Sequence, residues 1–146
     1  MKNYEIKFLI DQGILSITSH SLSADAAYKV FKFRKFMNSA MLNLGEVERG
    51  LLDEVGINDV REFDARRARL VEESDMEELK KMNDQMASFI RLKGELMNDE
   101  QEYTGPKITW EEWHALQNEN ATVVDGKKID ILSGSVELLL EGTLWE

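Results

Sequence analysis

Apolar residues recur at alternating spacings of three and four along the segment 30–51. The series is Val30, Phe33, Met37, Ala40, Leu44, Val47 and Leu51. A mean period of about 3.5 residues keeps one side of a helix facing a neighbouring helix along its whole length. The same spacing resumes further along the chain at Leu79, Met82, Met86 and Phe89. The pattern therefore predicts a long helical hairpin with coiled-coil packing over residues 23–98, whose first helix covers residues 24–52.

Residues that start and stop helices mark boundaries within this hairpin. Ser23 is a suitable N-cap for the first helix, and Gly56 is a suitable C-cap. Asp59 then begins a new helix, while Ser74 and Glu77 fit the S-x-x-E capping box, in which each side chain satisfies a free backbone N–H group. We therefore expect the returning arm of the hairpin to be interrupted near residue 74.

Alternating apolar residues predict β-structure near the N-terminus. Tyr4, Ile6, Phe8 and Ile10 occupy every second position, as a half-buried strand requires. The segment 11–13 is typical of a turn, and a second short apolar run follows it. These features predict a β-hairpin over residues 1–22.

The C-terminal part of the chain predicts a short helix followed by a β tail. Thr109 and Glu112 form a capping box for a helix that ends near Gln117. The dipeptide Asp125-Gly126 is the one best suited to a tight β-hairpin. Alternation over 136–140 favours another strand, although a helix within 129–141 is an open alternative.

Together these elements predict an α+β fold. It consists of a long antiparallel helical hairpin and a small antiparallel β-sheet formed by the N- and C-terminal segments. A length of 146 residues suits a single domain covering 1–146. Within it we expect a β-hairpin at 1–22, the helical hairpin at 23–98, and the short helix with its β tail at 107–146.

The chain is acidic, with 28 Asp and Glu residues against 18 Lys and Arg residues and a net charge of −10. A field of this sign opposes direct binding to nucleic acids and to anionic membranes. It also favours solubility, which is the simplest explanation of the charge. The candidates for a functional acidic surface are Asp64, Glu72, Glu73, Asp75, Glu77 and Glu78.

One stretch departs from this acidic character, because residues 28–36 interleave lysine and arginine with aromatic rings. Cations beside aromatic rings are typical of single-strand binding, but lysine stems also commonly cover apolar surface on an ordinary helix. Phe31 and Phe36 fall outside the 3.5-residue series, so their rings need to be covered by another segment of the chain or by a partner. The candidates for a protein-interaction surface are Phe31, Phe36, Trp110, Trp113, Leu144 and Trp145.

No motif for catalysis, a cofactor or a metal stands out. The chain has no cysteine, and its two histidines, His20 and His114, cannot form a two-histidine metal helix. No glycine-rich phosphate loop occurs, and no serine lies in a nucleophile motif. We therefore expect a protein that is not an enzyme and that has no cofactor and no metal. No apolar run is long enough for a membrane span, and no signal peptide is recognisable, which predicts synthesis in the cytoplasm.

The order of these parts resembles small uncharacterised proteins of tailed phages and prophages. The resemblance covers residues 24–100 best. It lies in the pattern Ala27-Tyr28-Lys29-x-x-Lys32 near the start of a charged helical hairpin and in a hinge at Leu51-Leu52 followed by Gly56. The segment 108–117 and the Asp-Gly hairpin depart from that family. The family has no agreed activity, so the resemblance implies a phage-encoded protein in a bacterial cytoplasm.

Two functions from different classes fit these features. The first is a structural or assembly component of a phage that works through protein–protein contacts with a phage structural subunit, and a homo-oligomer is a further option. The second is an acidic inhibitor that mimics nucleic acid and blocks a host defence nuclease, as anti-CRISPR proteins do. We expect the first, located in the bacterial host cytoplasm or in the virion.

Overall fold

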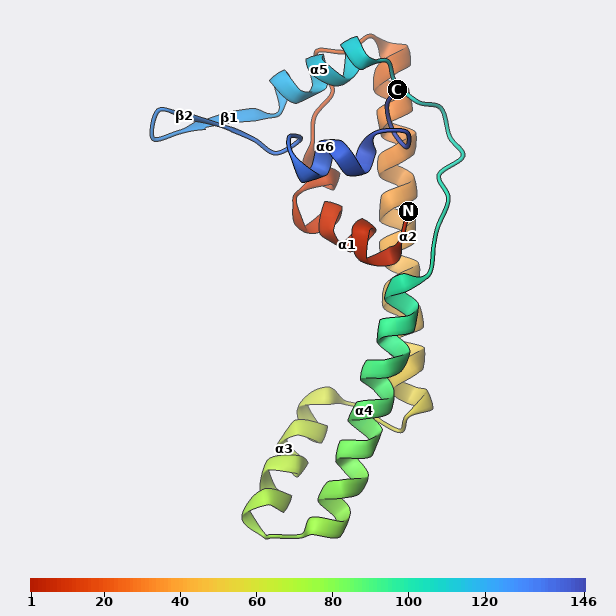
Figure 1. The fold of residues 1–146 in the computed structure, drawn as a ribbon, viewed down its shortest axis with the longest axis vertical. Coiled ribbons are helices and arrows are strands. Elements are labelled where there is room, and N and C mark those ends of the chain that lie inside the picture. The colour runs from red at the N-terminus through yellow and green to blue at the C-terminus, as the bar shows by residue number, and fades with distance from the viewer. The chain divides into compact units, whose positions relative to one another are not determined.

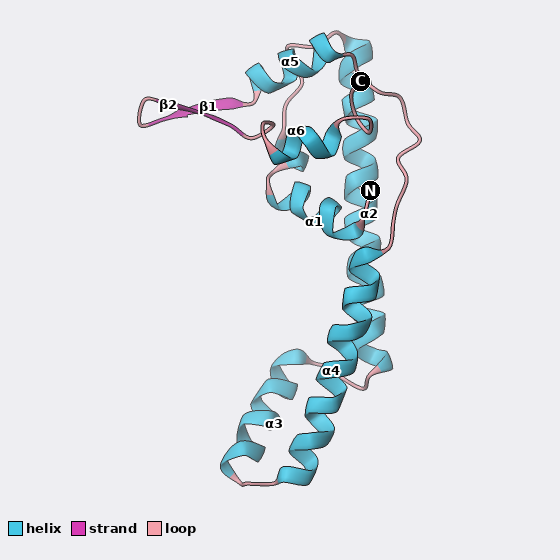
Figure 2. Ribbon diagram, in the orientation of Figure 1, coloured by secondary structure: helices cyan, strands magenta, loops and turns pink.

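The computed structural model describes residues 1–146 and is mostly helical (Figure 1; Figure 2). Its helices are α1 (Asn3–Asp11), the 3₁₀ turn η1 (Ile14–Ser16), α2 (Ala24–Glu54), α3 (Val60–Glu72), α4 (Met76–Asn98), α5 (Trp110–Glu119) and α6 (Ser135–Leu140). The strands β1 (Ala121–Val124) and β2 (Lys127–Asp130) form a two-stranded antiparallel sheet. Long helices with one small antiparallel sheet confirm the α+β class. None of the helices has the length and apolar character that a membrane crossing needs.

The chain forms two compact units, where the sequence predicted one domain. The first unit comprises Met1–Leu42 with Glu100–Glu146, and the second comprises Asn43–Asp99. Helix α2 contributes residues to both units. Each unit has its own core, and the members of the apolar series on α2 from Leu44 onward belong to neither core.

In the first unit, α1, α5 and α6 lie on the same side of α2 (Figure 1). The core that they enclose with η1 and the adjoining loops consists of Ile6, Leu9, Ile14, Ile17, Val30, Phe33, Met37, Ala40, Ile108, Trp113, Leu116, Leu132, Val136, Leu140 and Leu144. The first part of the α2 series, from Val30 to Ala40, therefore faces this core. The expectation that the whole series packs against the returning helix was wrong, because three other helices cover its first half.

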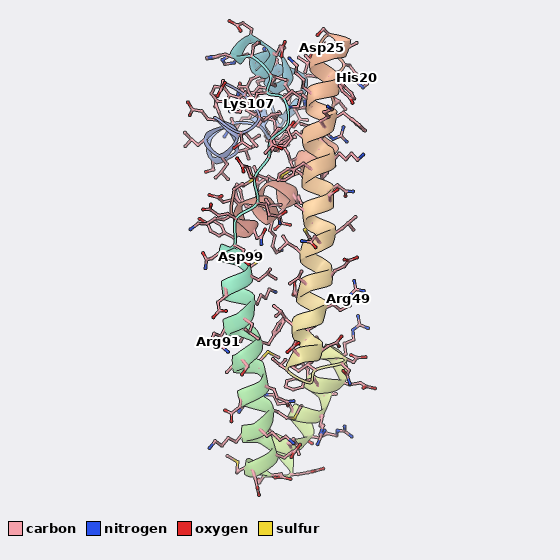
Figure 3. The ribbon with its side chains drawn as sticks, turned by 90° about the vertical axis from the view of Figure 1, so that its right-hand side faces the viewer. His20, Asp25, Arg49, Arg91, Asp99 and Lys107 are labelled. Carbon is pink, nitrogen blue, oxygen red and sulfur yellow. The ribbon has the colours of Figure 1, made fainter.

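The second unit contains the antiparallel helical arms. Helix α4 runs beside the part of α2 that belongs to this unit (Figure 3), and Lys93 Nζ lies 2.9 Å from a carboxylate oxygen of Glu48 across the two helices. The small core consists of Ile57, Phe63, Leu70 and Met82. Leu79 and Met86, two members of the second apolar series, pack against its edge.

Helix boundaries follow the predicted caps with one shift. Ser23 Oγ accepts a hydrogen bond from the Ala26 N–H group at 3.2 Å, and Gly56 has a positive φ of 80° at the end of α2. Asp59 caps α3, since its carboxylate accepts hydrogen bonds from the backbone N–H groups of Arg61 and Glu62. The break before α4 is confirmed, but its N-cap is Asp75, not Ser74. The reciprocal box of Thr109 and Glu112 at the start of α5 is present, as predicted.

The β-hairpin predicted over residues 1–22 is absent, because this segment forms α1 and η1. The alternating pattern also contains a helical one: Ile6 and Leu9 are three residues apart and fully buried, whereas Tyr4 and Phe8 are exposed. The Lys2 N–H group donates to the Glu5 carboxylate at 2.7 Å, which satisfies a free group at the start of α1. The N-terminal segment therefore contributes nothing to the sheet.

The tail combines the predicted hairpin with a helix. Asp125 and Gly126 both have positive φ, 50° and 75°, which is the geometry of the tight turn expected for Asp-Gly. Segment 136–140 belongs to α6, so the strand predicted there was wrong. On this helix Val136 and Leu140 share one face and are both buried, which the spacing of four residues allows.

Candidate protein-interaction surface on α2

The structure separates the six predicted interaction residues into two groups. Trp113 and Leu144 are fully buried and belong to the core of the first unit. Trp145 is half-buried, and its ring stacks on that of Trp113 with centroids 5.7 Å apart. These residues hold the C-terminal segment in place, because the Ile108 N–H group also donates to the Leu144 carbonyl at 2.8 Å. The tail is therefore part of the core and offers no anchor to a partner through Leu144.

Besides the half-buried Trp145, three of the candidates retain accessible surface. Phe31 is 55% exposed and Trp110 is 40% exposed. Phe36 is half-buried against the core of the first unit. Trp110 contacts the ring of His114, with centroids 3.8 Å apart, so much of one face of its ring is already covered. Phe31 is thus the most accessible of the six.

Phe31 lies in a group of aromatic rings on α2. Tyr28, one helical turn earlier, is 54% exposed and stacks on Phe31 with centroids 6.2 Å apart and ring planes at 18°. The ring of Phe36 contacts that of Tyr103, with centroids 5.4 Å apart. We call these four residues, Tyr28, Phe31, Phe36 and Tyr103, the aromatic face. Helical spacing makes neighbours of Tyr28 and Phe31.

Tyr103 reaches the aromatic face from the connector between α4 and α5. Its ring meets Phe33 edge to face at 5.2 Å, and its hydroxyl group donates to the Pro106 carbonyl at 3.0 Å. Burial raises the pKa of the Tyr103 phenol above its ordinary value, because a buried site disfavours the charged phenolate. Sequence analysis missed Tyr103, because nothing in the acidic segment 99–105 indicates that it folds back onto α2.

Two hollows flank Phe31. One of about 400 Å³ is lined by the aromatic face together with Lys32, Lys35, Ser39 and residues 102–105. The other, of about 410 Å³, is lined by Leu15, Phe31, Arg34, Lys35 and Asn38. Phe31 and Lys35 line both hollows. The exposed ring is therefore a ridge between two depressions, each large enough for a side chain of another molecule.

A larger hollow of about 550 Å³ lies in the second unit. Its lining is mainly charged or amide-bearing, with Glu54, Glu77, Lys80, Lys81, Asp84 and Gln85 around the single apolar residue Val55. A surface of this kind is ordinary for a solvated helix pair. The smaller hollows beside Phe31 have more of the aromatic lining that protein interfaces use.

The cations of the segment 28–36 differ in how they are engaged. Lys29 pairs with Asp25 at 3.6 Å, and Arg34 Nη2 donates to the Leu15 carbonyl at 2.6 Å. Lys32 lies over the Tyr28 ring, with Nζ 5.0 Å from the centroid. Neither Lys32 nor Lys35 has a carboxylate partner within the chain. Two ammonium groups beside the exposed rings are therefore free to meet an incoming negative charge.

The predicted acidic residues lie in the second unit. Asp64, Glu72, Glu73, Asp75 and Glu77 are exposed, and four of these lie close to the turn that joins α3 to α4. Glu78 is half-buried and forms an ion pair with Arg66 at 2.7 Å. Arg67 donates to Asn83 on the same pair of helices. Carboxylates and cations are therefore interspersed over this surface.

No known protein family, no curated protein and no solved structure matches this chain.

Proposed function

We propose that this protein acts by binding another protein through the aromatic face, without catalysis. In keeping with the resemblance of its sequence, its role is that of a phage-encoded structural or assembly component, in the bacterial host cytoplasm or in the virion. The observation that carries the proposal is the stacked pair Tyr28 and Phe31, each more than half exposed on one continuous helix.

Exposed aromatic rings beside hollows are what protein interfaces use. Interface cores are enriched in aromatic residues, and a few such anchors carry most of the binding free energy. Here the helix that carries the rings is held in place, because Phe33 and Met37 on another side of α2 are fully buried. A rigid support lowers the conformational entropy that the aromatic face itself loses on binding. A scattered exposed apolar residue needs no explanation, but a stacked pair between two hollows is a concentrated patch.

The alternative, an inhibitor that mimics nucleic acid, has one observation in its favour. Exposed carboxylates lie near the turn between α3 and α4. A mimic of a duplex needs a continuous row of negative charges, whereas α3 also carries Arg66, Arg67 and Arg69. The mixed surface therefore favours binding through the aromatic face.

Site-specific cross-linking tests the proposed function. A photoreactive phenylalanine analogue at position 31, in the protein expressed in cells of its natural host, should form a covalent adduct with a discrete partner. The matched control carries the analogue at Leu138, an apolar position on α6 that is 72% exposed. Equal yields of the cross-linked partner at positions 31 and 138, or no cross-link at position 31, would contradict the proposal.

A further inference from the structure

We infer that the aromatic face receives an acidic segment of the partner protein, in which an aromatic or aliphatic side chain is flanked by carboxylates. This inference rests on the proposed function and names the chemistry of the partner at the same surface. It is carried by three observations: the hollows beside Phe31, the two unpaired lysines, and the limited extent of the positive charge.

The hollows define the apolar part of the partner. A side chain that enters the hollow of about 400 Å³ contacts Tyr28, Phe31 and Phe36 together. One that enters the hollow of about 410 Å³ contacts Phe31 and Leu15. Burial of an apolar side chain against these rings is favourable in either place, and aromatic pairs add a directional attraction.

The unpaired lysines define the charged part of the partner. Lys32 and Lys35 both line the hollow of about 400 Å³ beside Phe31, and neither has a carboxylate partner within the chain. They are three residues apart on a helix, so their ammonium groups flank one region of surface. Carboxylates placed beside these groups form charge-assisted hydrogen bonds and set the orientation of the bound segment.

The limited extent of the positive charge distinguishes a short acidic segment from a longer polyanion. Glu102 lines the hollow of about 400 Å³, Asp25 lies one helical turn before Tyr28, and the chain as a whole carries a net charge of −10. A nucleic acid or an anionic membrane extends beyond two lysines and would meet these carboxylates, within the ~8 Å range over which charges act in physiological salt. A peptide with two or three carboxylates is matched by Lys32, Lys35 and the guanidinium group of Arg34, whose hydrogen bond goes to the neutral Leu15 carbonyl.

Selection from a library of random displayed peptides tests this inference on the purified full-length chain. Enriched peptides should contain aspartate or glutamate on both sides of an aromatic or aliphatic residue. A synthetic copy of an enriched peptide should bind the variant Lys32→Glu/Lys35→Glu about tenfold more weakly or worse, since opposite charges become like charges. Lys29→Glu is the matched control, because Lys29 already pairs with Asp25 and should lose less than about threefold.

Several outcomes would overturn the inference. These are the absence of any enriched peptide, the enrichment of basic or uncharged peptides, and an equal loss of affinity in the Lys29 control. Tighter binding of a labelled oligothymidylate than of the acidic peptide would assign the surface to nucleic acid. Self-association of the pure protein that Phe31→Asp abolishes would assign it to a second copy of the chain. If cross-linking at position 31 captures a partner while the library yields no acidic sequence, the proposed function stands and this inference fails.

Discussion

The backbone of Gly105 lies so close to the ring of Tyr103 that a Cβ atom at residue 105 would overlap the ring. The hydroxyl group of Tyr103 is fixed by the Pro106 carbonyl, and its ring is fixed by Phe33 and Phe36. The ring therefore has little freedom to move aside. Glycine at this position lets the connector pass beneath the ring and close one side of the hollow beside Phe31.

Replacement of Gly105 by alanine should therefore destabilise the first unit. We expect a loss of about 1–3 kcal/mol in the free energy of unfolding, the usual cost of an extra methyl group at a tightly packed site. Urea unfolding followed by tryptophan emission measures this change.

The same substitution at Gly45 provides the control. Gly45 lies within α2, and a Cβ atom there meets nothing within 4 Å. Alanine should stabilise the helix at this position by about 0.5–1 kcal/mol. Equal effects of the two substitutions would show that the contact between Gly105 and Tyr103 is unimportant.

The sequence allowed the long helices and their ends to be predicted, because local chemistry determines them. Gly56 ends α2 and Asp59 begins α3 through contacts within a few residues. The turn at Asp125-Gly126 is local in the same way. Each of these features depends on the conformational preferences or hydrogen bonds of adjacent residues, which a sequence shows directly.

The sequence did not show which surfaces the helices bury. Segment 4–10 satisfies both a strand and a helix pattern, and the contacts of Ile6 and Leu9 with the core of the first unit decide for the helix. The apolar series on α2 gave no sign that only its first part, Val30 to Ala40, belongs to a core, whereas Val47 is exposed. Phe31 could be picked out because it falls outside that series, but Tyr103 could not, because its place on α2 depends on a contact between distant residues.

The pH dependence of stability should contain a contribution from Glu119 at the end of α5. Burial raises the pKa of this carboxyl group, but hydrogen bonds from Thr18, Ser21 and His20 outweigh burial and lower the pKa to about 2. The His20 N–H group donates to one carboxylate oxygen at 2.9 Å, and the Ser21 N–H group donates to the other. The ionised group thus ties the loop before α2 to α5.

A pKa that is lower in the folded protein than in the unfolded chain fixes the sign of this effect. Ionised Glu119 stabilises the fold fully above pH 4.5, the ordinary pKa of the group, and this contribution is lost as the pH falls toward its folded-state pKa of about 2. Glu119→Gln should therefore be less stable than the parent at pH 7, and the difference should vanish near pH 2. Denaturant unfolding at a series of pH values measures it. Glu111→Gln on the same helix is the control, and a constant difference from the parent at all pH values for Glu119→Gln would contradict the assignment.

The two units should differ in their response to mutations in their cores. Phe63 belongs to the small core of the second unit, whereas all three tryptophans, Trp110, Trp113 and Trp145, belong to the first. Phe63→Ala should cost the second unit about 3–5 kcal/mol. In denaturant unfolding, the transition followed by far-ultraviolet circular dichroism should then gain a first step at lower denaturant concentration. The midpoint of the transition followed by tryptophan emission should not change.

Phe33→Ala is the matched control for this experiment. Phe33 is fully buried in the core of the first unit, so its replacement should shift the tryptophan transition directly. If Phe63→Ala shifts both probes together, α2 couples the two units into one cooperative structure.

The last prediction distinguishes the two functions by the surface that each requires. Glu72, Glu73 and Glu77 are exposed, and their carboxylates make no hydrogen bond or ion pair within the chain. Their replacement by lysine should leave the fold intact, provided that Asp75 is kept, because its carboxylate caps α4. An inhibitor that imitates nucleic acid depends on such charges, and six units of charge change should abolish its binding to a basic groove.

Binding through the aromatic face depends on different residues. For the partner that cross-links at position 31, the triple lysine variant should keep its affinity within about threefold, because those charges lie outside the contact. Phe31→Asp should weaken the same affinity by about thirtyfold, which corresponds to roughly 2 kcal/mol for the loss of an aromatic anchor. Leu138→Asp should have no effect on it. Titration calorimetry with the isolated partner measures all three variants. Loss of binding in the lysine variant together with full binding by Phe31→Asp would favour the nucleic-acid mimic over an assembly protein.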